Sequence, residues 1–349
     1  MRDYRVLFVH KFFTQGGGVE RVHKNLSVAL REAGVESVFY VYDTSGESEE
    51  GFAQLQQHYP AVAPDAHAGQ AAKIRCLFEL IKTRRINVII SATETANLLA
   101  LLCKFRFPSI RVIYTRHCAF DVSDQKLPPW AIKALYTLYS LTNGKIVAVS
   151  NGLKSQIQNT LLFGKNNVSF IPNAVLQPAI QSLAQETPAT PLPATYFCAV
   201  GRLVEQKGFD LLLQAYAKAL STTPSLPDLV IAGAGDDLEA LLKQTESLEI
   251  ADKVHFTGFI ANPYAVIKGA EAFILSSRHE GMPTVLIEAM YLNTPVIAFD
   301  CPTGPSELIT HNKTGLLVEA LNTDALAAAM CNYASLKTTC ISDSVNHFI

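Results

Sequence analysis

Short apolar runs rich in β-branched residues alternate with amphipathic helical patterns along this 349-residue chain, and this alternation limits the possible folds most strongly. Segment 19–34 shows the helical pattern, because its apolar residues recur every three or four positions and Gly34 follows in the usual C-terminal role. Strands are expected at residues 5–10, 37–42, 88–91, 111–115, 145–150 and 169–172, and again at 195–201, 229–235, 253–259, 272–277, 295–300 and 315–319. Apolar strands separated by helices predict an α/β protein with parallel sheets covered on both faces.

Residues 173–194 interrupt the alternation with four prolines among several Thr and Ala residues, which is typical of a linker. Chains beyond about 250–300 residues also tend to divide into domains. We therefore predict doubly wound, Rossmann-like domains at 1–172 and 195–332, facing each other across a cleft. Residues 173–194 would form the hinge and 333–349 a C-terminal tail. In such sheets ligands bind beyond the carboxyl ends of the strands, so the chemistry is expected in the loops there.

Charge is distributed unevenly about this hinge. Residues 1–172 hold 20 Lys and Arg against 13 Asp and Glu, a net of +7, whereas the remainder holds 9 against 18, a net of −9. The overall net charge of −2 argues against a strongly basic nucleic-acid-binding protein. The asymmetry has two interpretations: two solvated surfaces of different composition, or an N-terminal half that meets an anionic partner.

Three loops carry residues suited to chemistry, and the first is the glycine run before segment 19–34. Gly17 and Gly18, with Gly16 before them, allow backbone N–H groups to approach an anion at a helix N-terminus. The dinucleotide spacing GxGxxG fails here because Arg21 stands where its last glycine would be, and the Walker pattern is absent. By itself such a run can equally be a tight turn.

The second loop, GRLVEQKG at 201–208, follows the first expected strand of the C-terminal domain. Its Arg202 and Lys207 suit a diphosphate, since Lys supplies a point charge and Arg a forked donor. The plain alternative is two surface cations.

The third loop, SSRHEGMPTVLIEAM at 276–290, is the most specific. Gly281 fits a tight turn, and Thr284 and Val285 present backbone N–H groups at the start of a helix. Glu280 precedes that helix, and Glu288 lies inside it among apolar residues, where an unpartnered carboxylate is costly. This placement favours a ligand-binding or partnered role for Glu288 over a solvated helix face.

Together these motifs resemble the retaining glycosyltransferases of family 4, which have the GT-B fold, and in particular those of bacterial polysaccharide and lipid-linked oligosaccharide synthesis. The resemblance spans nearly the whole chain, with the motifs in the family's order. It implies a nucleotide-sugar donor, with a UDP-sugar favoured, and no other cofactor. It also implies no metal, and the sequence agrees in lacking a convincing DxD site.

The resemblance also assigns roles to individual residues. Arg202 and Lys207 would hold the donor diphosphate, Glu288 the ribose, and Gly17 and Gly18 would approach the phosphate. Glu280 would contact hydroxyls of the transferred sugar.

The position of His117 after an expected strand matches a family histidine near that sugar, so we expect it to be catalytic together with Glu280. A lone histidine there would otherwise be an ordinary loop residue. Gly258 and Phe259 match the loop that reads the base.

For the reaction we expect transfer of a hexose or N-acetylhexosamine to an acceptor hydroxyl. Front-face attack, in which the leaving phosphate oxygen takes the acceptor proton, is preferred over a double displacement with Glu280 as nucleophile. One departure from the family is the end of the chain, where the usual long crossing helix looks truncated or absent.

The acceptor is expected on the N-terminal side. Residues 73–165 contain 14 Lys and Arg against four acidic residues, and segment 127–141 adds aromatic and leucine side chains including Trp130. Cations and aromatic residues together favour a lipid-linked or surface-polysaccharide acceptor and a peripheral contact with an anionic membrane. The alternative is an ordinary core-facing helix at 127–141.

The scattered cysteines fit reduced thiols, and no run of about 18 apolar residues is present, so we expect a cytoplasmic protein at the inner face of the plasma membrane. The second candidate activity is a nucleotide-sugar epimerase on the same GT-B fold. A nicotinamide dehydrogenase is disfavoured by the failed glycine spacing, and a scaffold protein by the full set of donor-site residues.

Overall fold

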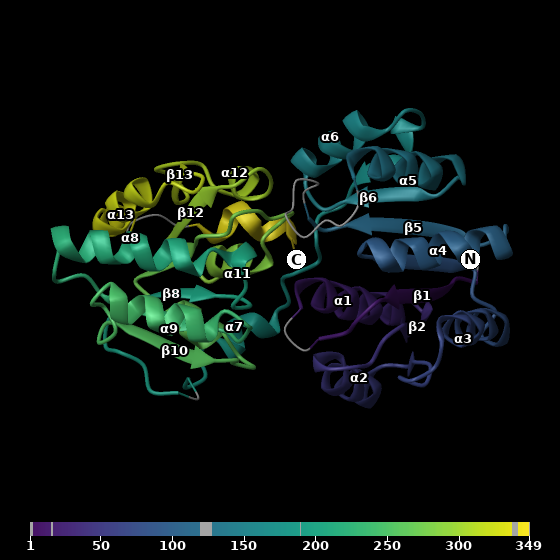
Figure 1. Cartoon of the computed structure of the whole chain (residues 1–349), viewed down its shortest axis with the longest axis horizontal. Helices are drawn as coiled ribbons and strands as arrows, with labels where there is room; N and C mark the ends of the chain where they lie inside the picture. The colour runs from purple at the N-terminus through teal and green to yellow at the C-terminus, as the bar shows by residue number, and fades with distance from the viewer. Residues whose placement is uncertain (1–2, 15–16, 119–127, 189, 337–340, 349) are drawn as a thin grey trace. The chain divides into compact units, whose positions relative to one another are not determined.

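The computed structural model describes residues 3–14, 17–118, 128–188, 190–336 and 341–348. Its chain forms two compact units, Met1–Ala174 and Val175–Ile349. Each unit has its own parallel sheet with helices on both faces, as the sequence predicts (Figure 1). Among the described residues, no helix combines the length and the apolar character needed to span a bilayer.

The described part of the first unit holds a seven-stranded parallel sheet in the order β3-β2-β1-β4-β5-β6-β7. The strands are β1 (Arg5–His10), β2 (Glu36–Val41), β3 (Ala61–Val62), β4 (Val88–Ala92), β5 (Arg111–Arg116), β6 (Lys145–Ala148) and β7 (Val168–Phe170). The helices are α1 (Gly18–Glu32), α2 (Glu47–His58), α3 (Gln70–Thr83), α4 (Glu94–Arg106), α5 (Pro129–Leu141) and α6 (Asn151–Thr160), with a 3-10 turn η1 (Lys165–Asn167).

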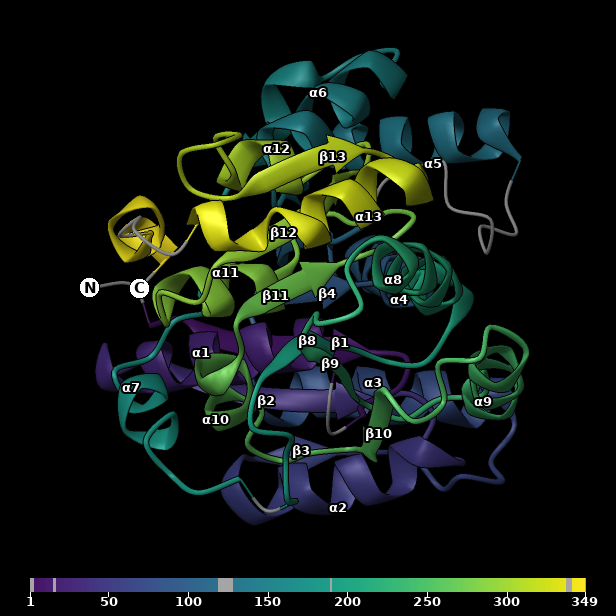
Figure 2. The same ribbon diagram turned by 90° about the vertical axis from the view of Figure 1, so that its left-hand side faces the viewer.

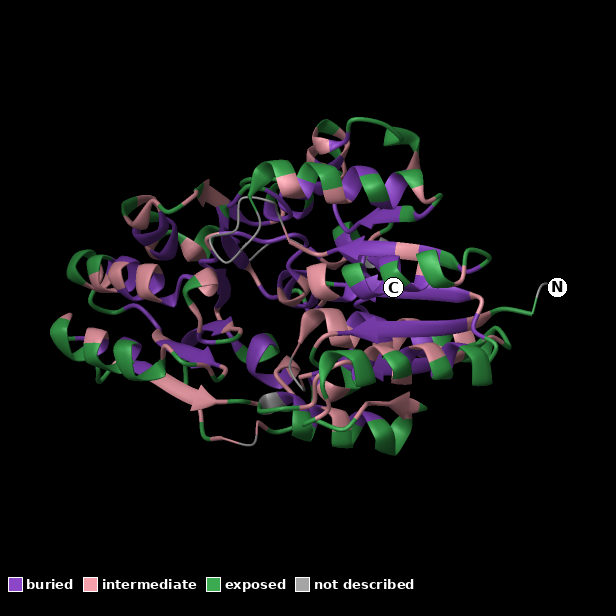
Figure 3. Ribbon diagram, turned by 45° about the vertical axis from the view of Figure 1, so that its right-hand side comes forward, coloured by how far each residue is buried: buried purple, intermediate pink, exposed green. Residues whose placement is uncertain are grey.

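Strand order explains the layering of this unit. From β1 the chain proceeds to β2 and β3 on one side, then crosses over to β4, β5, β6 and β7 on the other. Because such crossovers are right-handed, α1 and α2 cover one face and the helices after β3 cover the other. The central strands are mostly buried, and the helices carry both buried and exposed residues (Figure 3).

The described part of the second unit repeats the plan with six strands, in the order β10-β9-β8-β11-β12-β13. The strands are β8 (Tyr196–Val200), β9 (Asp228–Ala232), β10 (Val254–Gly258), β11 (Ala272–Leu275), β12 (Val296–Asp300) and β13 (Leu316–Glu319). The helices are α7 (Ala179–Leu183), α8 (Phe209–Thr222), α9 (Leu238–Ser247), α10 (Tyr264–Gly269), α11 (Thr284–Tyr291), α12 (Pro305–Leu308) and α13 (Thr323–Cys331), with 3-10 turns η2 (Glu205–Lys207), η3 (Tyr333–Leu336) and η4 (Ser342–Phe348).

Here α8 and α9 lie on one side of the sheet and α10 and α11 on the other (Figure 2). A large apolar cluster joins α8 and α13 to the strands, with Phe197, Leu212 and Leu326 fully buried in it. Amphipathic helices are stabilised mainly by burying such a face, so this cluster holds the unit together.

The proline-rich segment joins the second unit more closely than a linker would. Its residues from Val175 onward belong to that unit, and Leu176, Ile180 and Ala184 are buried. The C-terminal residues also pack there, because η4 lies against α11 and the Leu176 N–H donates to the Phe348 carbonyl at 3.2 Å. The structure thus places the boundary between the units at Ala174 and Val175.

Candidate functional site

In the second unit, β8 and β11 are neighbours in the sheet, although β9 and β10 lie between them in the sequence. The chain adds strands outward from β8 on one side and outward from β11 on the other. This is the topological switch point, where open α/β sheets bind their ligands at the carboxyl ends of the strands. The loop after β8 carries Arg202 and Lys207, and the loop after β11 carries Glu280. Two of the three loops selected from the sequence therefore meet at one place in this unit.

Lys207 and Glu280 form an ion pair there, with 2.7 Å between Nζ and Oε1. The pair is largely shielded, because the Lys207 side chain is 19% exposed and that of Glu280 is 8% exposed. Ser277 also donates its hydroxyl to Glu280 Oε1 at 2.7 Å, and the Thr303 hydroxyl donates to the Glu280 carbonyl. Glu280 is therefore held by side chains from three loops, and a polar ligand entering here meets a fixed carboxylate.

A second set of contacts fixes η2 to the loop after β11. Arg278 forms a two-pronged ion pair with Asp210 at 2.6 and 2.7 Å and donates to the Glu205 carbonyl at 2.9 Å. Burial raises the pKa of Asp210, but the hydrogen bonds and charge of Arg278 outweigh it and hold that pKa below its usual value. The main chain adds a hydrogen bond from the Arg278 N–H to the Gln206 carbonyl at 2.8 Å. Arg278 and Asp210 thus position Lys207, and the sequence analysis missed both.

Close backbone approach completes this corner. Gly208 has a φ of +63°, and a Cβ there would lie 2.1 Å from the Ser276 carbonyl oxygen. Any side chain at this position would push η2 away from the loop after β11. Only glycine allows Lys207 and Glu280 to stand this close together.

Arg202 lies in the same loop as Lys207 but is exposed. Among the described residues its guanidinium has no hydrogen-bond or ion-pair partner, in contrast to Lys207. The Lys207 stem packs over Gly201, whose added Cβ would lie 3.5 Å from the Lys207 methylenes. Among the described residues, the loop therefore holds one cation in an ion pair, Lys207, and one without a partner, Arg202.

The turn after β9 also approaches this loop, which the sequence analysis treated only as the end of a strand. Gly201 and Leu203 donate their N–H groups to the carbonyls of Ala232 and Ala234, at 3.0 and 2.9 Å. A Cβ on Gly233 would lie 1.8 Å from the Gly201 carbonyl oxygen. The Gly-Ala-Gly sequence at 233–235 was the available signal for this close contact.

Gly258 and Phe259 end the neighbouring strand β10. Gly258 has a φ of +71° and accepts a hydrogen bond from the Gly233 N–H at 2.8 Å. The Phe259 side chain is 52% exposed, so its ring is available to a flat partner. The turn after β9 thus lies between these two residues and the loop that carries Arg202 and Lys207.

Helix α11 begins beside Glu280. Gly281 is buried in the turn before it, while Thr284 and Val285 are its first two residues and are half-buried. The first N–H groups of a helix have no acceptor within that helix and carry partial positive charge. An anion near Thr284 and Val285 would therefore be stabilised.

Glu288 lies one turn further along α11 and is 1% exposed. The Tyr264 hydroxyl lies 3.4 Å from Glu288 Oε1, and the residues on either side of Glu288 are buried and apolar. Glu288 is therefore buried and in polar contact with Tyr264, not part of a solvated helix face.

In the first unit, the glycine loop already holds a negative charge. Gly17 precedes α1 and Gly18 is its first residue, whereas Gly16 lies outside the described residues. The Glu20 carboxylate lies over this loop, with Oε1 at 3.4 Å from the Thr14 N–H, and a Cβ on Gly17 would lie 1.9 Å from Glu20 Oε2. An incoming phosphate would have to displace this carboxylate, which the sequence analysis did not anticipate.

His117 follows β5 and belongs to a group of three histidines at the carboxyl ends of β1 and β5. His23 Nδ1 lies 2.9 Å from His10 Nε2, and the rings of His23 and His117 are 6.2 Å apart. Burial, and secondarily the charge of Arg116, lowers the pKa of His117 to about 4. His117 is therefore neutral at physiological pH.

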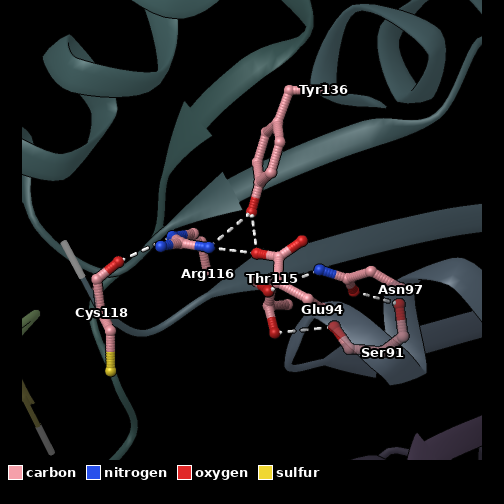
Figure 4. Close-up of polar contacts among 7 residues, drawn as sticks. All are labelled: Ser91, Glu94, Asn97, Thr115, Arg116, Cys118 and Tyr136. Atoms are coloured by element: carbon pink, nitrogen blue, oxygen red, sulfur yellow. Dashed lines mark hydrogen bonds and ion pairs between the residues drawn. The ribbon is translucent and has the colours of Figure 1, made fainter. Parts of the chain in front are cut away.

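An ion pair beside His117 was also missed from the sequence. Arg116 pairs with Glu94, the Tyr136 hydroxyl donates to the same Glu94 oxygen at 2.7 Å, and Arg116 Nε donates to the Cys118 carbonyl at 2.7 Å (Figure 4). Glu94 opens α4 directly after Thr93, whose φ of +77° is rare for a β-branched residue. Strained backbone of this kind concentrates at functional sites.

No group of three or more His, Cys, Asp and Glu side chains in the described ranges is arranged to hold a metal ion.

Comparison with known proteins agrees with this geometry. Residues 16–175 match the family model described as Glycosyltransferase Family 4, and residues 184–337 match Glycosyl transferases group 1. The chain is 26% identical to the amylovoran biosynthesis glycosyltransferase AmsD of Erwinia amylovora, over 94% of this chain and 89% of that protein.

A shorter match joins the chain to an N-acetylgalactosaminyltransferase of Campylobacter jejuni. That protein is named as acting on N-acetylgalactosamine-N,N'-diacetylbacillosaminyl-diphospho-undecaprenol, and it is 36% identical over 38% of this chain and 35% of its own length. These matches are to transferases and do not favour the epimerase alternative.

Among solved structures, HepE of Anabaena in complex with UDP and glucose has the same fold. Its TM-score is 0.77 at 17% sequence identity, covering 99% of this chain and 94% of that one. The two family models together span almost the whole chain, in the order of its two units. This protein is a glycosyltransferase of family 4 with the GT-B fold.

Proposed function

We propose that this glycosyltransferase is a retaining enzyme that moves a hexose or N-acetylhexosamine from a UDP-sugar to a hydroxyl of a lipid-linked or surface-polysaccharide acceptor. The observation that carries the proposal is the shielded pair of Lys207 and Glu280, with Arg202 in the same loop and Glu288 in the adjoining helix. Cations suit a diphosphate, and buried carboxylates suit sugar hydroxyls. The UDP and glucose held by HepE support a nucleotide-sugar donor of this kind.

In the proposed reaction the acceptor oxygen attacks the anomeric carbon on the face that the diphosphate leaves. The new C–O bond forms as the bond to the phosphate oxygen breaks, and that phosphate oxygen takes the acceptor proton. Lys207, Arg202 and the N-terminus of α11 at Thr284 and Val285 stabilise the charge that develops on the diphosphate. These groups supply the neutralisation for which other enzymes use a metal ion, so we propose that none is required.

Glu280 positions the transferred sugar by accepting hydrogen bonds from its hydroxyls. The Lys207 ammonium and the Ser277 hydroxyl both donate to one of its oxygens, Oε1, and this directs its remaining acceptor capacity toward a ligand. Glu288 binds the ribose diol, and Gly258 and Phe259 contact the base. In the first unit, Gly17 and Gly18 approach the phosphate, and His117 acts on the sugar being transferred.

The acceptor side of the proposal rests on the first unit. Its exposed apolar side chains on α4 and α5 suit a lipid surface, and the Campylobacter relative is named for a diphospho-undecaprenol substrate. We propose a peripheral contact with an anionic membrane at the inner, cytoplasmic face of the plasma membrane.

Donor choice is tested first, by measuring the thermal shift of the protein with uridine and guanosine nucleotides. NMR of the product formed from an α-linked UDP-sugar then gives the configuration. An α-linked product supports retention, whereas a β linkage contradicts it. Release of free sugar or an epimer without any acceptor would favour the epimerase instead.

The roles of the ion pair are tested with Lys207→Met and Glu280→Gln. We expect Lys207→Met to weaken UDP binding, because a cation on the diphosphate is lost. Glu280→Gln is expected to keep UDP affinity within about twofold and to lower turnover at least about tenfold, since a charge-assisted hydrogen bond is worth about 1.5–3 kcal/mol. Lys218→Met is the matched control, because it also breaks an ion pair of the second unit, with Asp324, but at an exposed place. Equal effects of Lys207→Met and Lys218→Met would contradict the proposal.

A further inference from the structure

His117 is connected to the strand beside it through a buried hydroxyl. Its Nε2 lies 2.9 Å from Thr115 Oγ1, and Thr115 Oγ1 lies 2.8 Å from the carbonyl oxygen of Ser91 on β4. Thr115 is buried and His117 is half-buried. The Thr115 hydroxyl thus links the imidazole to β4.

The hydrogen bonds of Thr115 determine which ring nitrogen of His117 carries the proton. A carbonyl oxygen only accepts, so the Thr115 hydroxyl must donate its single proton to Ser91. The contact with His117 is then a hydrogen bond only if Nε2 carries a proton and donates it to Thr115. A neutral ring protonated at Nε2 has its lone pair at Nδ1.

Neutrality follows from the surroundings. The charged and titratable groups that face His117 are Arg116 next to it and the ring of His23, which itself pairs with His10. Burial and the Arg116 charge both oppose protonation of His117, so the neutral form holds at physiological pH. Among the described residues, His117 Nδ1 has no hydrogen-bond partner, which leaves its lone pair available to a ligand.

The backbone on both sides of His117 is also fixed. Asn97 Nδ2 donates to the Thr115 carbonyl at 3.3 Å, and the Ser91 hydroxyl holds the Asn97 oxygen at 2.7 Å (Figure 4). Beyond His117, the Cys118 carbonyl accepts from Arg116 Nε. The main chain on both sides of His117 is therefore held in place by hydrogen bonds, which keeps the ring beside Thr115.

We infer that Thr115 is a positioning residue that holds His117 in the Nε2-protonated tautomer, so that Nδ1 accepts a hydrogen bond from a sugar hydroxyl during transfer. This inference rests on the proposed function of His117 and adds the atom through which it acts. It also gives a role to the buried hydroxyl of Thr115 on β5.

The tautomer is measured directly by long-range ¹H–¹⁵N NMR on histidine-labelled wild-type protein, with His117→Gln used to assign the signals of the ring. We expect the protonated-nitrogen signal at Nε2 and the unprotonated one at Nδ1. A wild-type ring protonated at Nδ1 overturns the inference. This measurement does not depend on any variant folding or on activity.

The positioning role is tested with Thr115→Val, which removes the hydroxyl but keeps the shape, and with Thr115→Ser as the matched control. We expect Thr115→Val to give mixed tautomers of His117 and a roughly tenfold lower kcat, the size of one lost hydrogen bond, with an unchanged KM for the donor. Thr115→Ser should restore both. Wild-type kcat and an unchanged tautomer in Thr115→Val would overturn the inference.

The role of His117 and the role of Thr115 can be tested separately. If His117→Gln transfers sugar as fast as wild type, the proposed role of His117 is wrong, and Thr115 then has nothing to position. If His117→Gln is slow but Thr115→Val is not, only the positioning role of Thr115 is overturned.

Discussion

Glu288 is a buried carboxylate at a place in the second unit where ordinary packing would put an apolar side chain. Glu288 is as buried as the apolar residues that flank it, although an ionised carboxylate in such a place is costly. Leu286 and Ile287 before it are fully buried, as are Ala289 and Met290 after it. The Tyr264 hydroxyl is one polar contact of Glu288, and we have proposed a ribose diol as another.

The expected result for Glu288→Gln is weaker nucleotide binding with little change in fold, because the amide keeps the volume but loses the charge. We expect UDP affinity to fall about 10- to 100-fold, which corresponds to about 1.4–2.8 kcal/mol. Isothermal titration calorimetry measures the affinity, and the thermal midpoint reports the fold. Glu239→Gln, an exposed residue of α9, is the control. An unchanged UDP affinity in Glu288→Gln would remove Glu288 from the site.

Among elements, β1, α1 and the end of β5 each place one histidine in the interior of the first unit. Burial is the main cause of the low pKa of all three: His10 falls to about 3, His117 to about 4, and the pKa of His23 lies well below its usual value. In the unfolded chain each ring has a pKa of about 6.5. Between these values the unfolded state binds more protons than the folded one, so the free energy of unfolding decreases as the pH falls.

This accounting predicts an acid-sensitive first unit. At pH 5.5 each neutral buried histidine costs on the order of 1 kcal/mol relative to neutral pH, so the three together lower the free energy of unfolding by a few kcal/mol. Carboxylates with a pKa near 4 change little over this range. Urea unfolding at pH 7.5 and at pH 5.5 measures the difference, with the exposed His67→Asn as a control that should keep it. Equal free energies at the two pH values would contradict the prediction.

The elements themselves were largely predictable, because their signal is local. Each strand expected from the sequence is present with its ends shifted by only a few residues, while β3 (Ala61–Val62) was missed because two residues show no periodicity. The cation and carboxylate of the Lys207–Glu280 pair were both predicted, but their contact was not. Arg278 and Asp210, which lie 68 positions apart, were missed because nothing in the sequence joins them.

On the scale of the whole molecule, one face of the first unit is unusually apolar. Helices α4 and α5 follow consecutive neighbouring strands and so cover the same side of the sheet. They expose large apolar side chains, with Trp130 73% exposed; the others are Leu98, Leu102, Phe105, Leu138 and Leu141. Arg106 and Lys133 are exposed on the same two helices. The sequence left a core-facing helix at 127–141 as the alternative, and α5 does bury Ile132, Tyr136 and Tyr139, while Trp130 at its start is exposed.

We expect the protein to float with vesicles containing phosphatidylglycerol and to bind poorly to vesicles of phosphatidylcholine alone. Trp130→Ser combined with Phe105→Ser should weaken binding at least about tenfold, because a buried large apolar side chain contributes about 1.5–3 kcal/mol. Leu242→Ser, which removes an exposed leucine from α9 of the second unit, is the control. Flotation that does not depend on anionic lipid, or on Trp130 and Phe105, would remove the membrane contact.

The missing side chain of Gly208 has a consequence for how this sequence can vary. Lys207 and Glu280 can lie close together only because residue 208 has no Cβ, since a Cβ there would collide with the Ser276 carbonyl oxygen. We therefore expect Lys207, Gly208 and Glu280 to be retained together. In a library covering every substitution, position 208 should tolerate no replacement, even alanine. Glu205, which holds Arg278 through its main-chain carbonyl, should accept many. Around the Lys207–Glu280 pair, the position least tolerant of substitution would then be Gly208, which has no functional group at all.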